Sequence, residues 1–245
     1  MERIDLIVDI GNSYVKFCFA IDDYLGEKHS IPNENALTIL EEHIENIKLS
    51  SAILSSTSSE EYTESILVLL EPKVKVHYLD SKSKLLFKMG YRTPKSLGLD
   101  RIANVNAAAV LFPKLTSLII DIGTCITYDV LSEGTSYRGG AITPGWRMRY
   151  KSMNDYSARL PLLDSLDLKE FPGESTKESL KAGVFYGILG EIHQIVNEIE
   201  QSFGAVKVII TGGDASHFVG GIKKPIFANP KLTLKGLHEI LKHNN

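Results

Sequence analysis

Residues 118–124 read Leu-Ile-Ile-Asp-Ile-Gly-Thr, and this stretch decides the fold. An apolar run that stops at an aspartate and passes directly into Gly-Thr predicts a buried strand with a tight, polar turn at its end. The strand end presents the carboxylate of Asp121 beside that turn. The stretch therefore predicts a place that holds a charged ligand.

The same arrangement occurs near the N-terminus, where residues 6–13 read Leu-Ile-Val-Asp-Ile-Gly-Asn-Ser. The offset between the copies is 112 for both the aspartates (121 − 9) and the glycines (123 − 11), close to half of the 245 residues. A single Asp-x-Gly is common in turns. Two matching copies favour an ancient duplication over the alternative of two unrelated buried strands.

The length of 245 residues is comfortable for two domains, and the composition is that of a globular protein. The chain has 43% hydrophobic and 23% charged residues, with a formal net charge of −3 and no dense basic block, so we expect no nucleic-acid partner. No apolar stretch approaches the roughly 18 residues of a membrane span. Cys18 and Cys125 lie in apolar runs, which predicts buried thiols in a reducing compartment. We therefore expect a cytoplasmic protein.

The first half begins with a predicted hairpin, formed by strands at 4–9 and 14–20 around the turn 10–13. Such a turn can aim backbone N–H groups and two side chains at phosphate oxygens, with Lys16 adding a positive charge from the second strand. Taken alone, Lys16 is as well explained as a surface lysine. A helix from Asn33, a strand at 52–54, a helix at 60–71 and a strand at 74–79 follow, and this alternation predicts an α/β layered domain.

A polar loop with Gly and Pro, residues 91–101, leads into a predicted Ala-rich helix at 101–112. Asp100 has two interpretations here. It is a good N-cap for that helix, and N-caps usually do nothing else. Gly98 and Arg101 beside it favour a ligand-facing corner, because catalytic groups concentrate on loops held by rigid scaffolds.

The second half repeats the plan, with strands predicted at 118–122, 125–131 and 137–142. Ser175 and Glu178 form a capping box for a long helix that ends near residue 203. Gly183, Gly187 and Gly190 lie near one face of that helix and suggest that another helix packs closely there. A strand at 206–210 delivers the turn Thr211-Gly212-Gly213. From residue 232 we predict a solvated amphipathic helix, whose His238 and His243 do not have zinc-ligand spacing.

Together these pieces resemble the actin, hexokinase and heat-shock chaperone superfamily, and within it the type III pantothenate kinases. The resemblance spans nearly the whole chain. The matching pieces, in order, are Asp9-x-Gly-Asn-Ser with Lys16, Gly98-x-Asp100-Arg101, Asp121-x-Gly-Thr-x-x-Thr-x-Asp129, Gly139-Gly-x-Ile-x-Pro-Gly145, Leu160-Pro161, Thr176 and Thr211-Gly-Gly-x-Ala215.

The resemblance implies a nucleotide site with one phosphate loop from each half and a Gly-Gly turn against the adenosine. The residues that it assigns to ATP are Asp9, Ile10, Gly11, Asn12, Ser13, Lys16, Gly123, Thr124, Gly212 and Gly213. It implies that Asp9 binds Mg²⁺ and that Asp121 helps to hold a monovalent cation, K⁺ or NH₄⁺.

The resemblance also implies the substrate site. Asp100 would be the base, with Tyr91, Gly98, Leu99 and Arg101 around pantothenate. Thr176 would reach pantothenate from the partner subunit of a homodimer with a shared active site. Two positions depart from the family pattern, which has Ala where this chain has Cys125 and His-Thr where it has Tyr156-Ser157.

We therefore expect two duplicated actin-like, ribonuclease-H-like domains, residues 1–115 and 116–245, each a mixed sheet flanked by helices, with a nucleotide cleft between them. The expected activity is ATP-dependent phosphorylation of pantothenate to 4′-phosphopantothenate, the first step of coenzyme A biosynthesis. The main alternative is a catalytically inactive, nucleotide-binding regulatory protein, since some relatives were first described as transcription accessory factors. A sugar or acetate kinase fits the short length and the Gly-x-Asp-Arg loop less well.

Overall fold

The computed structural model describes residues 2–167 and 171–245. The chain divides into two compact units. The first runs up to Pro113 and takes in Lys231–Asn245, and the second is Lys114–Pro230.

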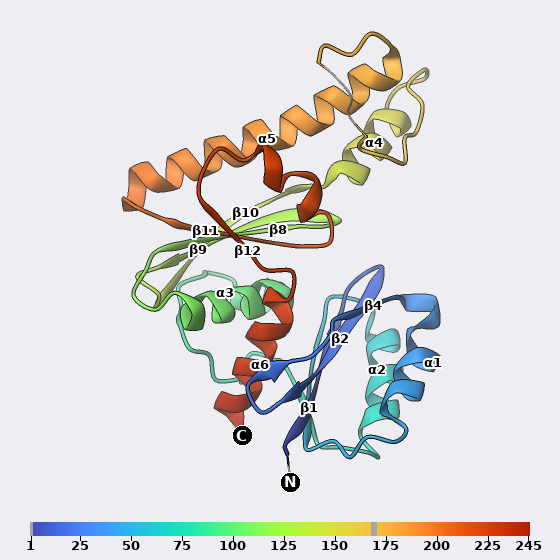
Figure 1. Cartoon of the computed structure of the whole chain (residues 1–245), viewed down its shortest axis with the longest axis vertical. Coiled ribbons are helices and arrows are strands. Elements are labelled where there is room, and N and C mark those ends of the chain that lie inside the picture. Colours follow the sequence, from blue (N-terminus) through green and yellow to red (C-terminus); the bar gives the residue numbers. More distant parts are fainter. Residues whose placement is uncertain (1, 168–170) are drawn as a thin grey trace. The chain divides into compact units, whose positions relative to one another are not determined.

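The first unit is a mixed sheet with helices on both faces (Figure 1). Its elements are β1 (Ile4–Ile10), β2 (Tyr14–Ile21), β3 (Tyr24–Leu25), β4 (His29–Pro32), α1 (Asn33–Ile44), β5 (Ser51–Ser56), α2 (Glu60–Leu70), β6 (Val76–Tyr78), β7 (Lys88–Met89), a 3-10 turn (Pro94–Ser96), α3 (Leu99–Leu111) and α6 (Leu232–Asn244).

The sheet of the first unit has the order β3-β2-β1-β5-β6, with β4 also paired to β2. Strands β1 and β2 form the predicted antiparallel hairpin, while β5 and β6 run parallel to β1. Helices α1 and α2 bury apolar side chains such as Leu40 and Ile66 against one face of the sheet. Helices α3 and α6 cover the other face.

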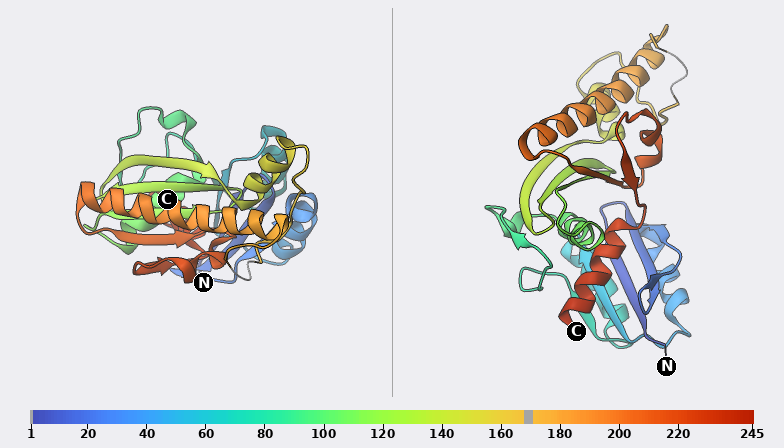
Figure 2. Two further views of the ribbon diagram at one scale, coloured as in Figure 1. Left: turned by 90° about the horizontal axis from the view of Figure 1, so that it is seen from above. Right: turned by 60° about the vertical axis from the view of Figure 1, so that its left-hand side comes forward.

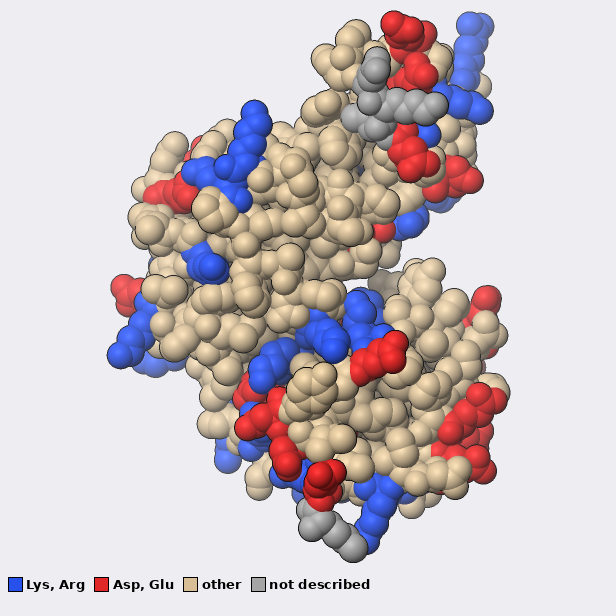
Figure 3. Space-filling model, in the orientation of Figure 1, with Lys and Arg blue, Asp and Glu red and all other residues tan. Residues whose placement is uncertain are grey.

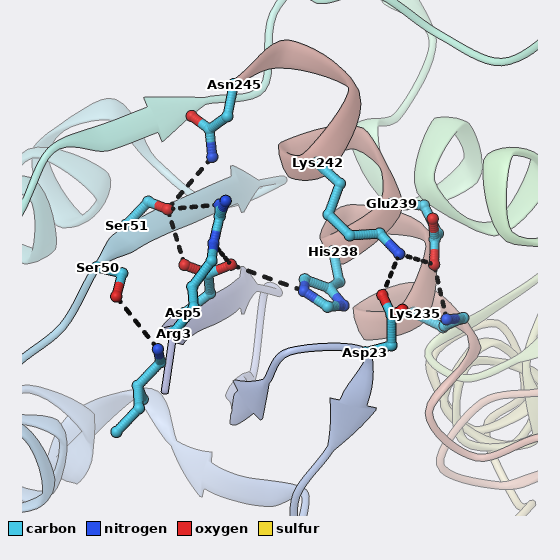
Figure 4. Close-up of polar contacts among 11 residues, drawn as sticks. Arg3, Asp5, Asp23, Ser50, Ser51, Lys235, His238, Glu239, Lys242 and Asn245 are labelled. Carbon is cyan, nitrogen blue, oxygen red and sulfur yellow. Dashed lines mark hydrogen bonds and ion pairs between the residues drawn. The ribbon is translucent and has the colours of Figure 1, made fainter. Parts of the chain in front are cut away.

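The C-terminal helix corrects two expectations. We placed it in the second half of the chain and on the surface, whereas α6 packs against α3, β1 and β5 of the first unit. Three of its polar residues, Thr233, His238 and Glu239, are buried with the apolar ones, and His238 is 0% exposed. Two of these buried groups have polar partners in the same unit: the Thr233 hydroxyl donates to the Asn104 side chain, and Glu239 forms an ion pair with Lys235. Figure 4 shows this helix beside β1.

The second unit repeats the strand plan of the first. Its elements are β8 (Ser117–Ile122), β9 (Cys125–Ser132), β10 (Ser136–Pro144), α4 (Trp146–Asp155), α5 (Thr176–Phe203), β11 (Lys207–Thr211), two 3-10 turns (Ala215–His217 and Val219–Gly221) and β12 (Ile226–Ala228). Strands β8 and β9 form an antiparallel hairpin, and β11 and β12 run parallel to β8, so the order is β10-β9-β8-β11-β12. The predicted duplication is confirmed at the level of strand connections.

Helix α5 lies across the sheet of the second unit (Figure 2) and buries Val184, Ile188 and Ile192 in its core. Ser175 is its N-cap, and the Ser175 hydroxyl accepts a hydrogen bond from the Glu178 N–H. The opposite arm of the capping box differs from the expectation, because the Glu178 carboxylate accepts from the Glu174 N–H.

The glycine face of α5 is covered in part. Arg149 of α4 lies 3.7 Å from where a Cβ on Gly187 would be, so the expected packing of another helix is met at Gly187. No described atom lies within 4 Å of where a Cβ on Gly183 or Gly190 would be, and both residues are exposed.

The two thiols differ in their surroundings. Cys18 is buried as predicted, and burial raises the pKa of its thiol to about 12, against a smaller opposite effect of Lys231. Cys125 is only half-buried, so the expectation of a second buried thiol is wrong. It lies at the start of β9, where the strand leaves the polar turn.

Charges of both signs are interspersed on the face drawn in Figure 3. Within residues 2–167 and 171–245, no helix is both long and apolar enough to cross a membrane.

Candidate active site

Asp9 lies at the centre of the first unit's sheet, between two polar neighbours from adjacent strands. It is paired in register with Lys16 on β2 and with Ser55 on β5. The Lys16 ammonium is 3.8 Å from Asp9 Oδ2, and the Ser55 hydroxyl donates to Asp9 Oδ1 at 2.9 Å. Asp9 is only 3% exposed, so the hairpin holds a buried carboxylate beside a half-buried cation.

The turn after Asp9 is held by hydrogen bonds from Asn33, the first residue of helix α1. The side-chain amide of Asn33 donates to the carbonyls of Gly11 and Asn12, at 3.0 and 3.1 Å, and the Asn33 N–H donates to the carbonyl of Ser13 at 3.1 Å. Phosphate oxygens are repelled by carbonyl oxygens and attracted by N–H groups. By engaging three carbonyls, Asn33 makes the turn more suitable for an anion.

Asp100 does not cap helix α3. The N-cap is Gly98, and Asp100 is the second residue of the helix, so the N-cap interpretation is wrong. A Cβ on Gly98 would lie 2.5 Å from Asp100 Oδ1, which shows that the carboxylate folds back over Gly98. Asp100 Oδ1 also accepts from the Arg101 N–H at 2.8 Å. Arg101 is 4% exposed, and Tyr91 is half-buried in the preceding loop.

A cavity of about 460 Å³ opens beside this corner, within the first unit. It is lined by Gly98 and Leu99 and by the ends of the parallel strands β5 and β6, including Ser56, Thr57 and Tyr78. The carboxyl ends of parallel strands are where α/β sheets commonly bind ligands. Of the predicted substrate residues, Gly98 and Leu99 therefore line this cavity, whereas Tyr91, Asp100 and Arg101 are not among its lining residues.

In the second unit, Asp121 occupies the position that Asp9 has in the first. Its register partners are Thr127 on β9 and Thr211 on β11. Asp121 Oδ1 is 3.9 Å from where a Cβ on Gly123 would lie, so the carboxylate faces the turn. The exposed Thr124 follows directly.

The Gly212-Gly213 turn rests on the end of β8. Gly212 has φ +103°, and a Cβ there would collide with the backbone of Ile122, so glycine is required. The Asp214 N–H donates to the Ile122 carbonyl at 3.0 Å. The Asp214 carboxylate accepts two bonds of 3.0 Å from Arg147, whose guanidinium lies 3.9 Å from the centre of the Trp146 ring.

The turn between β10 and α4 contacts the turn formed by Gly123 and Thr124. The Gly145 N–H donates to the Thr124 carbonyl at 3.0 Å. Arg149 donates to the Pro144 carbonyl and pairs with Glu191 on α5 at 2.7 Å. Burial alone would raise the pKa of Glu191, but hydrogen bonds from Thr143, Tyr128 and Arg149 lower it. Glu191 is therefore an anchor that stays charged.

Thr176 is the first residue of α5 and is exposed. It lines a cavity of about 440 Å³ in the second unit, together with Ser175, Ser179 and Gly183.

The structure thus gathers the predicted residues into two sets, one in each unit. Asp9 to Lys16 and Tyr91 to Arg101 belong to the first unit, and Asp121 to Thr124, Thr176 and Gly212-Gly213 to the second.

Sequence reasoning missed the residues that support these turns, namely Asn33, Ser55, Arg147, Arg149, Asp214 and Glu191. One signal was present for Ser55. The serines at 51 and 55 repeat the spacing of the aspartates at 5 and 9.

The described residues alone do not form a site for a divalent cation, so a bound nucleotide would have to contribute ligands to the cation. The described residues contain no group of three His, Cys, Asp or Glu side chains that could bind a metal. Mg²⁺ in kinases is usually bound through one or two carboxylates together with the phosphates of the nucleotide. Asp9 fits this use, since its carboxylate lies at the end of β1, directly before the glycine turn, and is held by the neutral Ser55 hydroxyl.

Comparison with known proteins agrees with this geometry. The family model for type III pantothenate kinase matches residues 5–198. The type III pantothenate kinase of Flavobacterium johnsoniae is 33% identical over 243 residues, covering 97% of both chains. That of Christiangramia forsetii is 36% identical over 250 residues, covering 98% of this chain and 99% of the relative.

Solved structures agree on the fold. A Campylobacter jejuni protein described as a Baf family transcriptional activator has a TM-score of 0.66 and 25% identity, covering 98% of each chain. A Listeria monocytogenes protein described as an N-acetylmannosamine kinase has a TM-score of 0.56 over the full length of both chains, at 12% identity. The second likeness concerns the fold alone, that of two actin-like domains. On the family model and the full-length relatives, the chain belongs to the type III pantothenate kinase family.

Proposed function

We propose that this kinase transfers the γ-phosphoryl group of ATP to the primary hydroxyl of pantothenate and makes 4′-phosphopantothenate. The observation that carries the proposal is the pair of equivalent strand-end carboxylates, Asp9 and Asp121, each followed by a glycine turn, with a third acid at the start of α3. Full-length relatives that are type III pantothenate kinases support the choice of substrate.

In this proposal the first phosphate turn is formed by Asp9, Ile10, Gly11, Asn12 and Ser13, with Lys16 beside them. Gly123 and Thr124 form the second turn, and Gly212 and Gly213 lie against the adenosine. Phosphoryl transfer asks the protein mainly for positioning and for neutralisation of charge. Lys16 supplies a fixed positive charge, and the N–H groups of the turns bind phosphate oxygens.

Mg²⁺, held by Asp9 and the phosphates, would supply the remaining charge neutralisation. The chain's own residues hold the two turns in place. Asn33 keeps carbonyl oxygens away from the phosphates, and Glu191 and Arg149 hold the turn on which Thr124 rests.

Asp100 is proposed as the base that accepts the proton of the pantothenate hydroxyl. Gly98 leaves the space into which its carboxylate folds, and Gly98 and Leu99 line the 460 Å³ cavity proposed for pantothenate. Arg101 and Tyr91 are proposed to contact pantothenate from beside this cavity.

A monovalent cation, K⁺ or NH₄⁺, is proposed at Asp121. A carboxylate beside ATP phosphates adds unfavourable negative charge unless a cation lies between them. The position of Asp121 facing the second turn is suited to that role.

A homodimer with a shared site is proposed, in which Thr176 reaches the pantothenate of the partner subunit. Support comes from the exposed Gly183 and Gly190 of α5 and from two exposed apolar side chains, Tyr186 on the same helix at 47% and Ile142 on β10 at 60%. A substitution of Gly183 by arginine should give monomers in light scattering. An unchanged dimer would locate the contact elsewhere.

The activity itself is tested by a coupled assay for ADP release with ATP, Mg²⁺ and pantothenate, with and without K⁺. ADP formation that depends on pantothenate is expected. We place the enzyme in the cytoplasm, whose reducing conditions suit its two free thiols. The similarity to the Campylobacter jejuni protein described as a Baf family transcriptional activator suggests one alternative, a nucleotide-binding regulator. ATP binding without any ADP release under these conditions would favour that alternative.

A further inference from the structure

Two serines on β5 stand opposite two aspartates on β1. In the parallel pairing of these strands Asp5 is in register with Ser51, and Asp9 with Ser55. Both hydroxyls donate to the Oδ1 atom of their aspartate, at 2.8 and 2.9 Å. The sheet therefore contains the same serine–aspartate pair twice, once toward each end of β1.

The surroundings of the two pairs differ. Asp5 is surrounded by other polar groups, as Figure 4 shows, since Arg3 donates to Oδ2 at 2.8 Å and to the Ser51 hydroxyl at 3.0 Å. His238 lies 3.8 Å from the same carboxylate. This end is a structural ion pair far along the strand from the phosphate turn.

The Asp9–Ser55 pair has Lys16 as its charged neighbour. Ser55 is 0% exposed, and Asp9 lies directly before the turn at Gly11. The Lys16 ammonium lies 3.8 Å from Oδ2. The two oxygens of the Asp9 carboxylate thus have different neighbours, because Oδ1 accepts from the Ser55 hydroxyl and Oδ2 faces Lys16.

We propose that Ser55 is a positioning residue for Asp9. Its hydroxyl fixes the rotation of the carboxylate, and thereby the direction from which the carboxylate would meet the divalent cation of the bound nucleotide. This inference rests on the proposed role of Asp9 as the Mg²⁺ carboxylate. The second unit has a comparable arrangement, because the buried Thr211 on β11 places a hydroxyl residue in register with Asp121.

A hydrogen bond to a charged acceptor is strong enough to matter here. Its loss should weaken the contribution of Mg²⁺ to nucleotide binding by roughly 10- to 100-fold. Nucleotide binding without the metal should change little, since Ser55 has no proposed contact with phosphate.

The test compares Ser55→Val with Ser55→Thr, two variants of nearly equal volume of which only the second keeps a hydroxyl. Ser55→Ala removes the hydroxyl without adding volume. Ser51→Val and Ser51→Thr are the matched controls on the same strand pair. For each protein, calorimetry measures ADP affinity with Mg²⁺ and with a chelator, and melting temperature reports the fold.

The expected result is a loss of the Mg²⁺-dependent gain in affinity for Ser55→Val and Ser55→Ala, with the gain kept by Ser55→Thr and by both Ser51 variants. The Ser51→Val protein should lose melting temperature only. An equal loss in Ser51→Val, or a full Mg²⁺ response in folded Ser55→Ala, would overturn the inference.

The same samples separate this inference from the proposed function. A wild-type protein that phosphorylates pantothenate while Ser55→Ala keeps its Mg²⁺ response refutes only the inference. A wild-type protein that binds Mg²⁺–ADP through Ser55 and phosphorylates nothing refutes only the function.

Discussion

Replacement of Asp100 by asparagine separates a catalytic carboxylate from a structural one. Asp100 is the second residue of α3, and the N-cap is Gly98, so the substitution removes no cap. Asparagine keeps the size of the side chain and can still accept from the Arg101 N–H, as Asp100 Oδ1 does at 2.8 Å. What is lost is the negative charge and the proton acceptor.

The two losses differ greatly in size. A negative charge in the first turn of a helix stabilises it by about 0.3–1 kcal/mol. For a protein of this length that corresponds to a decrease in melting temperature of about 1–4 °C. A general base contributes ~10²–10⁴-fold in rate, or about 3–5 kcal/mol of transition-state stabilisation. The predicted outcome is a nearly normal melting temperature with a large loss of kcat.

The assay measures kcat, KM for pantothenate and melting temperature for Asp100→Asn beside Glu61→Gln. Glu61 is the matched control, because it is also an acid at the second position of a helix, α2, and is exposed. Glu61→Gln should lose similar stability and no activity. A folded Asp100→Asn enzyme with near-normal kcat would refute the assignment of the base.

Three further predictions concern other parts of the molecule. Asp121→Ala should abolish K⁺-dependent activity while the circular dichroism spectrum is kept, and equal wild-type activity in Na⁺ and K⁺ would contradict the cation site. Mixing Thr176→Val with Asp100→Asn protein should restore part of the activity in heterodimers, and no restoration despite proven subunit exchange would remove the shared site. Burial lowers the pKa of His238 from its ordinary 6.5, with Lys242 acting in the same direction and Asp5 opposing. The neutral ring is favoured in the fold, so its contribution to stability is present above about pH 6.5 and lost as the pH falls through the lowered pKa. The melting temperature of wild type should therefore fall more between pH 7.5 and 5 than that of His238→Phe, and parallel curves would show that this ring does not titrate.

The sequence by itself determined the elements and the family. The repeated Leu-Ile-(Val/Ile)-Asp-Ile-Gly located both hairpins, and the structure repeats the strand plan around them. Such motifs are local, and their apolar periodicity and turn residues act within a few positions along the chain. The candidate turns at Asp9, Asp121 and Gly212 were visible for the same reason.

Only the tertiary structure decided which residues support those turns. Ser55 is 46 positions from Asp9 and becomes its neighbour because β5 pairs with β1 in one particular register. Glu191 reaches the β10–α4 turn from a helix that crosses the sheet. The spacing of Ser51 and Ser55 repeats that of Asp5 and Asp9, but only the strand pairing shows that they meet, because parallel strands are joined by long connections.

The position of the C-terminal helix was decided in the same way. Its amphipathic pattern predicts one buried face, yet α6 is enclosed by α3, β1 and β5 and buries His238 and Glu239 as well. A helix pattern shows which side chains can be buried together. Which unit receives the helix depends on the surface to which the chain returns, and here that surface is the face of the first sheet left open by α1 and α2.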